Sequence, residues 1–189
     1  MVLPGHLSGG FITTTLILGS INHNFSLDQL TTLYIVGILS GELPDLDLLL
    51  FYLAKKILKT SKQTHRDFIT HLPLFWMIFC FIFFVFAYFE NSIFTMTMAI
   101  LVLAGTFSHF LFDSIDYGIQ WLRPFNKRRY CLFKLSGLNE FETDSVSQHI
   151  EVGSIKFYWN YHWKMYIKQP SFYAEIFVTL IAFLIFINQ

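Results

Sequence analysis

Charged residues are scarce in this sequence. Asp, Glu, Lys and Arg together make up 14% of its 189 residues, against roughly a quarter in a soluble domain. Hydrophobic residues make up 54%, and the 23 Phe residues are more than the core of a soluble domain of this length would hide. The composition therefore predicts an integral membrane protein. A net charge of zero gives no basic surface for nucleic acid, so we expect no such partner.

Cysteine is nearly absent as well. Cys80 lies inside an apolar run and Cys131 in a polar stretch, so we expect no disulfide between them. The N-terminus lacks the basic region and the small-residue cleavage site of a signal peptide, and we expect the first apolar segment to remain in the mature protein. No HExxH sequence occurs, which excludes the metalloprotease helix that carries this motif.

Cations are missing from most of the chain. All thirteen Lys and Arg residues fall in two windows, 55–66 and 123–168. Cationic loops of membrane proteins stay on the cytoplasmic side, so the two windows predict two cytoplasmic loops. Such loops contact anionic lipid headgroups, and we expect membrane lipids as partners.

The apolar runs predict an all-α fold, a multi-pass transmembrane helical bundle of about five segments. A span needs about 20 residues, and the first segment is at the lower limit. The second is interrupted by carboxylates, after which Pro44 suits the first turn of a new helix reaching about Lys59. Alternating crossings place the N-terminus in the cytoplasm and the C-terminus outside. The five segments are 9–21, 29–54, 72–89, 93–115 and 172–187.

The fourth segment carries the clearest group for chemistry. Gly105, His109 and Asp113 are spaced four residues apart, which puts them on one face of a helix. The His and the Asp can bind one metal ion together, and the small Gly allows another helix to come close. A His that only hydrogen-bonds a carboxylate at a helix end would look the same. Ionisable groups at membrane depth, however, usually mark a function.

A second group stands before the third apolar segment. His65 and His71 are six residues apart, so one straight helix would not align them. A turn followed by a helix that starts near Pro73 could do so. The alternative is an ordinary polar loop, with Arg66 holding a lipid phosphate.

Carboxylates and one further His complete the candidates. Glu42, Asp45 and Asp47 interrupt the second apolar segment. The dipole of a helix start favours carboxylates in any case, which accounts for at least one of them but not for three beside a long apolar run. His6 stands just before the first apolar segment and means little by itself.

The candidates are stronger together. Under the topology read from the cations, four separate parts of the chain deliver imidazoles and carboxylates to one layer at the cytoplasmic side. These ligands suit zinc, with manganese or iron as alternatives. Seven candidates exceed the four ligands of one tetrahedral ion, which allows one ion with supporting groups or two ions. They are His6, Asp45, Asp47, His65, His71, His109 and Asp113.

These elements resemble the YdjM family, described as LexA-regulated, inner-membrane, metal-dependent hydrolases. The order of His and Asp is also similar, more loosely, to zinc-dependent phospholipase C. Leu72 stands where family members often carry Ser or Thr, which does not affect the ligands. The resemblance implies the metal ligands His6, Asp45, His65 or His71, His109 and Asp113. It covers about residues 6–134 and lies in His6 with Gly9-Gly10, Gly41 to Asp47, His65-Arg66 with Thr70-His71, Gly105 to Asp113, Tyr117-Gly118 and Arg123-Pro124-Phe125.

The expected function is therefore a membrane-bound, metal-dependent hydrolase of an ester or phosphoester at the cytoplasmic leaflet. A phospholipid-like substrate is preferred because of where the site lies. Asp47 is expected to accept a proton or support a ligand, and Arg66 to steady a phosphate with its planar fork. A metal transporter would use the same ligands but needs a polar path to the outer face. A scaffold whose polar groups only pair with each other is a third reading.

Three regions follow from this interpretation. Residues 1–118 form the membrane-embedded core with the metal site. Residues 119–171 form a polar and aromatic cytoplasmic loop region, and residues 172–189 the C-terminal transmembrane helix. His23 falls on the opposite side of the membrane in this topology, outside the predicted site.

Overall fold

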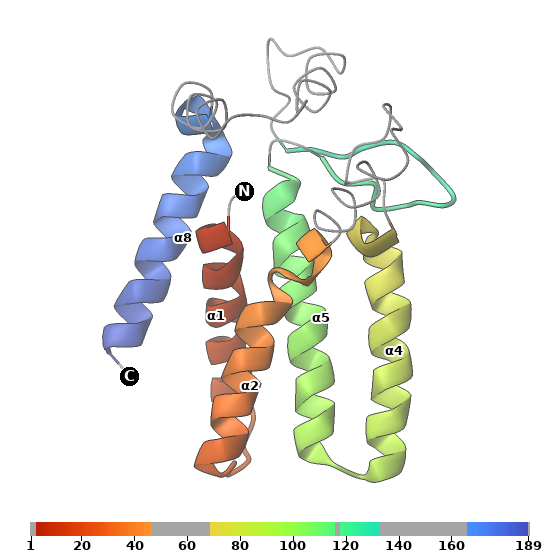
Figure 1. Cartoon of the computed structure of the whole chain (residues 1–189), viewed down its shortest axis with the longest axis vertical. Coiled ribbons are helices and arrows are strands. Elements are labelled where there is room, and N and C mark those ends of the chain that lie inside the picture. The colour runs from red at the N-terminus through yellow and green to blue at the C-terminus, as the bar shows by residue number, and fades with distance from the viewer. Residues whose placement is uncertain (1–2, 47–68, 116–117, 133–165, 189) are drawn as a thin grey trace, which may run out of the picture.

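The chain is a bundle of helices. The computed structural model describes residues 3–46, 69–115, 118–132 and 166–188. Consecutive helices run in opposite directions (Figure 1). Within these ranges the only β-structure is an isolated bridge between Ile119 and Tyr130. The described residues form five α-helices, α1 (Leu3–Ser20), α2 (Leu27–Ser40), α4 (Pro73–Glu90), α5 (Ile93–Asp113) and α8 (Pro170–Ile187).

Several helix boundaries confirm the sequence prediction and have local causes. α2 begins after Ser26, whose side chain accepts a hydrogen bond from the backbone N–H of Gln29, while the Gln29 side chain accepts one from the backbone of Ser26. This capping box satisfies two donors at the helix start. α2 ends at Ser40, just before the carboxylates that interrupt the second apolar segment. α4 begins at Pro73, because the missing N–H of proline is tolerated in a first turn.

The connection between α4 and α5 is a tight turn, in agreement with the short gap between the predicted segments 72–89 and 93–115. Asn91 has a left-handed backbone with φ of 53°, which Asn adopts more readily than most residues. The Ser92 hydroxyl then accepts a hydrogen bond from the backbone N–H of Thr95 at 3.2 Å and caps α5. α4 and α5 therefore form an antiparallel hairpin joined by Asn91 and Ser92.

The first helix starts earlier than its apolar run suggests. The sequence predicts a segment from residue 9, but α1 begins at Leu3. Pro4 fits there because the first N–H groups of a helix have no partner within it. His6 consequently belongs to the start of α1 and does not precede the helix. The helix predicted to run from Pro44 is described only at its beginning, where Leu43–Asp45 is a short 3-10 helix, η1.

Three helices, α4, α5 and α8, are long and apolar enough to cross a membrane. α2 is apolar but shorter, and α1 interrupts its apolar residues with His6 and several hydroxyl groups. α4 and α8 expose large apolar side chains such as Phe81 and Phe186, a surface suited to lipid. α5 is more buried than either, so it forms the centre of the bundle.

Small residues let α1, α2 and α5 come close. A Cβ atom added to Gly105 of α5 would collide with the side chain of Ser40 in α2, which confirms the close approach predicted at Gly105. A Cβ atom added to Gly10 of α1 would lie 2.7 Å from the carbonyl oxygens of Gly37 and Ile38. At both glycines an added Cβ atom would come much closer than ordinary van der Waals contact allows. The helices therefore pack backbone against backbone at these positions.

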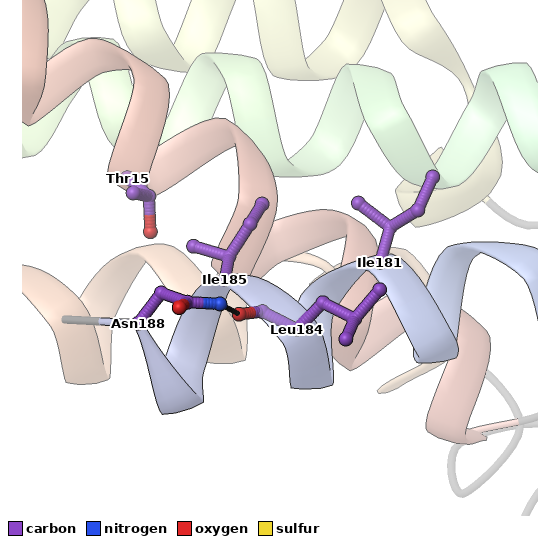
Figure 2. Close-up of a pocket in the computed structure, with 5 residues that line it drawn as sticks. All are labelled: Thr15, Ile181, Leu184, Ile185 and Asn188. Carbon is purple, nitrogen blue, oxygen red and sulfur yellow. Dashed lines mark hydrogen bonds between the residues drawn. The ribbon is translucent and has the colours of Figure 1, made fainter.

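The helices bring particular ends together. α1, α4 and α8 begin, and α2 and α5 end, at the same end of the bundle (Figure 1). A shallow groove of about 470 Å³ between α1 and α8 lies toward the other end, and its Asn188 side chain donates to the carbonyl oxygen of Leu184 (Figure 2). Because the predicted ligands lie at the first end, this groove is not the candidate site. It is lined by Thr15, Ile181, Leu184, Ile185 and Asn188.

Candidate metal centre

α5 carries the first two residues of the centre. His109 and Asp113 lie one turn apart near the end of α5, and their side chains are 0% and 2% exposed. The helix repeat turns both toward the same face. The Nε2 atom of His109 is 3.9 Å from Oδ2 of Asp113, so the spacing of four residues brings the pair together as predicted.

α1 brings His6 against this pair. The His6 ring is fully buried and stacks on the His109 ring, with centroids 3.8 Å apart. Its Nε2 atom lies 3.6 Å from Oδ1 of Asp113. Each oxygen of the Asp113 carboxylate therefore faces an imidazole: Oδ1 faces His6 of α1, and Oδ2 faces His109 of α5.

Two short 3-10 helices supply the remaining residues. η1 places Oδ1 of Asp45 at 3.6 Å from Nε2 of His109. The second, η3 (Ile69–His71), buries His71 with its Nε2 atom 3.3 Å from Oδ2 of Asp113 and its Nδ1 atom 3.9 Å from Oδ1 of Asp45. α4 starts two residues later at Pro73, so His71 lies in the turn before a helix that the sequence predicts.

A backbone contact orients the His109 ring. Its Nδ1 atom is 2.8 Å from the carbonyl oxygen of Gly41. Because a carbonyl oxygen only accepts hydrogen bonds, Nδ1 is the donor. In the neutral ring Nε2 then keeps its lone pair, and Nε2 is the atom that faces Asp45 and Asp113. This arrangement is typical of a metal-binding His, whose other nitrogen donates to a carbonyl or carboxylate.

The five residues form two overlapping groups that could hold a metal ion, and within each group the donor atoms lie within 4.8 Å of one another. Five His–Asp pairs occur in the cluster, and in each pair the imidazole nitrogen lies 3.3 to 3.9 Å from the carboxylate oxygen. These separations are close to the edge of about 3.3 Å expected for a tetrahedron with bonds of about 2.0–2.1 Å. The groups are His6, His109 and Asp113, and Asp45, His71 and His109.

Among the described residues, several buried imidazole nitrogens of the cluster have no hydrogen-bond partner, which also suits a metal ion. Within the described ranges, neither ring nitrogen of His6 has a hydrogen-bond partner, and Nε2 of His109 has none. Buried polar atoms are normally satisfied, and an imidazole nitrogen without a donor or acceptor beside it can be satisfied by a cation. The residues present therefore suit a divalent ion.

One side of the cluster is more open than the rest. The Asp45 side chain is 21% exposed, whereas those of the other four residues are at most 2% exposed. Glu42 lies nearby, in the turn after α2. Burial and, secondly, the charge of Asp45 raise the pKa of Glu42 from 4.5 to about 8. Solvent therefore reaches the cluster beside Asp45, next to a carboxyl group that is mostly protonated at neutral pH.

Three residues predicted to belong to the site cannot be compared with the structure. Asp47, His65 and Arg66 lie outside the described residues, so their roles stay predictions. Of the two His candidates before α4, the structure describes only His71, and it brings His71 to Asp45 and Asp113.

Glu175 is a further buried residue beside the cluster, and no role was predicted for it. Its side chain in α8 is 7% exposed, and Oε1 accepts a hydrogen bond from the backbone N–H of Gly5 at 3.1 Å. Gly5 directly precedes His6, and its N–H belongs to the first turn of α1, where donors lack partners within the helix. A single carboxylate in an apolar run is the sequence feature that could have indicated a role.

A family model matches this sequence. It is described as YdjM inner membrane protein, and the match covers residues 1–188. The match thus continues past the motifs near residue 134 to the end of α8. No curated protein and no solved structure matches the chain. On this match, together with its apolar helices, the chain belongs to the YdjM inner membrane protein family.

Proposed function

We propose that the protein is a membrane-bound, metal-dependent hydrolase that acts on an ester or phosphoester at the cytoplasmic leaflet. One observation carries the proposal. Three imidazoles and two carboxylates from four parts of the chain meet at one end of an apolar bundle, with His–Asp distances of 3.3 to 3.9 Å. Burying such groups near a membrane is costly, and they are usually kept there for a function.

The cluster would hold one ion, zinc before manganese or iron. When bound, the ion would act as a Lewis acid and lower the pKa of a water molecule toward neutrality. The carbonyl group of Gly41 keeps the metal-binding nitrogen of His109 directed at the cluster. The proposed ligands are His6, Asp45, His71, His109 and Asp113.

Hydrolysis also needs proton transfer. The oxygen of water joins the carbonyl carbon or the phosphorus, the ester bond breaks, and the released alcohol takes up a proton. Asp47 is our candidate to accept the proton of water, and Arg66 to bind a phosphate oxygen. In the sequence, Asp47 lies two residues after the proposed ligand Asp45, and Arg66 lies five residues before the proposed ligand His71.

A lipid is the preferred substrate class. The cluster lies at the end of α5, a helix apolar enough to cross a membrane, so it would stand near the level of the headgroups. The more exposed side at Asp45 would then admit the ester or phosphoester of a lipid without removing it from the bilayer.

The proposal includes a topology of five crossings, with the N-terminus in the cytoplasm and α1 and α2 as the shorter crossings. The opposite directions of consecutive helices support it (Figure 1). Arg123 and Lys168 also support it, since they follow the end of α5 and precede α8 at the end of the bundle that holds the cluster. A reporter fused after Gln189 should therefore lie on the outer side of the membrane. A signal from the cytoplasmic side would contradict the topology.

Metal content is the first test. We expect detergent-purified protein to contain a divalent ion by elemental analysis, and the variants His109→Ala and Asp113→Ala to lose most of it. His23→Ala is the matched control, because His23 is exposed in the loop between α1 and α2. Equal metal content in all four proteins would refute the metal site.

Hydrolysis is tested separately. Wild-type protein in phospholipid vesicles should release fatty acid or a phosphorylated headgroup, and chelation or Asp113→Ala should abolish this release. Metal-dependent ion uptake by sealed vesicles without any release of product would instead identify a transporter. Folded protein with neither bound metal nor activity would identify a scaffold.

A further inference from the structure

Residues 118–132, which follow α5, form a segment with an unusual composition. The segment contains four cations and no acidic residue. It also contains large apolar residues, three of which are strongly exposed, Leu122 at 51%, Phe125 at 89% and Leu132 at 73%. A group of exposed apolar side chains rimmed by polar residues is a feature of surfaces that contact a partner or a membrane. The four cations are Arg123, Lys127, Arg128 and Arg129.

The base of this segment is fixed to the bundle. The backbone N–H of Gly118 donates to the carbonyl oxygen of Asp113, and that of Leu132 donates to the carbonyl oxygen of Ser114. Between them, Ile119 and Tyr130 exchange two backbone hydrogen bonds of 3.1 and 3.0 Å. Both ends of the segment are therefore hydrogen-bonded to Asp113 and Ser114 at the end of α5, beside the candidate metal centre.

Aromatic packing holds the base from the side. Ile119 is 2% exposed and belongs to the same apolar cluster as Trp76 of α4 and Phe110 of α5. Trp121 packs on Phe110, and its indole N–H donates to the Ser114 hydroxyl at 3.0 Å. The segment therefore has a fixed direction relative to the two helices.

The outer part of the segment points away from the core. In Figure 1 the cyan ribbon of residues 118–132 extends outward beyond α4 at the end of the bundle that holds the cluster. Phe125, Lys127 and Arg128 lie in sequence between the bridged residues Ile119 and Tyr130, and all three are exposed. The guanidinium of Arg128 lies 5.8 Å from the centre of the Tyr130 ring, within the range of a cation–π contact.

We propose that residues 118–132 bind anionic phospholipid headgroups beside α4, with Phe125 inserted at the membrane interface and Lys127 and Arg128 on the phosphates. Charge complementarity carries the choice of partner, because a cluster of cations without acids fits an anionic leaflet. Aromatic side chains at the headgroup level anchor such elements. The inference uses the membrane location of the family and does not depend on the proposed hydrolase.

The test measures the depth of Phe125 in lipid nanodiscs. A nitroxide label is placed on Phe125→Cys in a Cys131→Ser background, since Cys80 is buried and Cys131 is exposed. Collisions with oxygen, which dissolves in lipid, are compared with collisions with a water-soluble nickel complex. The nanodiscs contain phosphatidylcholine alone or phosphatidylcholine with phosphatidylglycerol. We expect the label to become more accessible to oxygen and less accessible to nickel when phosphatidylglycerol is present.

Two comparisons make the result specific. Replacing Lys127 and Arg128 together by Gln should remove the effect of phosphatidylglycerol, and so should high salt. A label on Asn24→Cys, in the exposed loop between α1 and α2 that carries no cation, should show no effect. A label at residue 125 that stays in water in both lipids, or an effect that survives the double Gln substitution, would overturn the proposal.

Discussion

The carboxylate of Glu175 in α8 accepts a hydrogen bond from the backbone N–H of Gly5 at the start of α1, 170 residues earlier in the chain. The bond satisfies a donor that α1 cannot satisfy itself. It also places a side-chain oxygen at the positive end of the helix dipole. Because His6 follows Gly5, the last helix of the chain fixes the backbone next to a proposed metal ligand.

We expect Glu175→Ala to weaken metal binding by about tenfold, as removal of a partner that orients a ligand commonly does. Glu175→Gln should retain most of the affinity, because its side-chain oxygen can still accept from Gly5. Affinity is measured by competition with a chromophoric chelator in detergent.

A second α1–α8 contact supplies the control for this prediction. The Ser8 hydroxyl donates to the Thr179 hydroxyl at 3.3 Å, one helical turn further along α8 from Glu175. Thr179→Val removes this bond without touching Gly5 and should leave the metal affinity unchanged. Equal losses in Thr179→Val and Glu175→Ala would mean that only the packing of α8 matters.

The stoichiometry follows from His109. It belongs to both groups that could hold an ion, yet its Nδ1 atom is engaged by the carbonyl of Gly41. Only Nε2 can bind a metal, so the two groups cannot each bind an ion through three residues. We expect one ion per chain at saturation by elemental analysis, and both His6→Ala and His71→Ala should lower its affinity. Two tightly bound ions per chain would contradict this reading.

Two glycines of α1 should respond oppositely to the same substitution. Gly10→Ala would bring a Cβ atom against backbone carbonyls of α2 that cannot rotate away, and overpacking of this kind typically costs about 1–3 kcal/mol. Gly19→Ala has open space around it and should change stability by less than about 0.5 kcal/mol. Thermal unfolding in detergent compares the two variants, and similar melting temperatures would show that α1 and α2 are less closely packed.

Glu42 should make stability depend on pH in the metal-free protein. Because burial raises its pKa from 4.5 to about 8, the folded protein binds a proton between these values that the unfolded chain releases. Stability should then fall as pH rises from about 4.5 to 8 and be independent of this group below that window. Glu42→Gln resembles the protonated form and should flatten the pH dependence of the melting temperature measured with chelator present. An unchanged slope would show that other groups cause it.

The sequence is sufficient to predict several elements because their causes are local. The hairpin of α4 and α5 follows from two apolar runs separated by Asn91 and Ser92, and the facing of His109 and Asp113 follows from the helix repeat. Ser40 as the end of α2 is predictable from the Gly, Glu and Pro residues that follow it.

Other features depend on contacts between distant parts of the chain and could not be predicted. The start of α1 at Leu3 is stabilised by Glu175 from the other end of the chain. The sequence spacing also cannot show that His71 reaches Asp113, since this contact depends on η3 and the start of α4. Asp45 reaches His109 only because η1 follows α2 closely.

The short connection between α4 and α5 has a consequence for biogenesis. Two long apolar helices joined by only Asn91 and Ser92 can leave the translocon together as a helical hairpin, already packed on each other. In the proposed topology only Glu90 and its neighbours would be carried across the bilayer, while His109 and Asp113, at the trailing end of α5, would never enter the hydrocarbon. His109 and Asp113 would thus stay at the cytoplasmic surface, and the site would form when α1 and α8 pack against the hairpin.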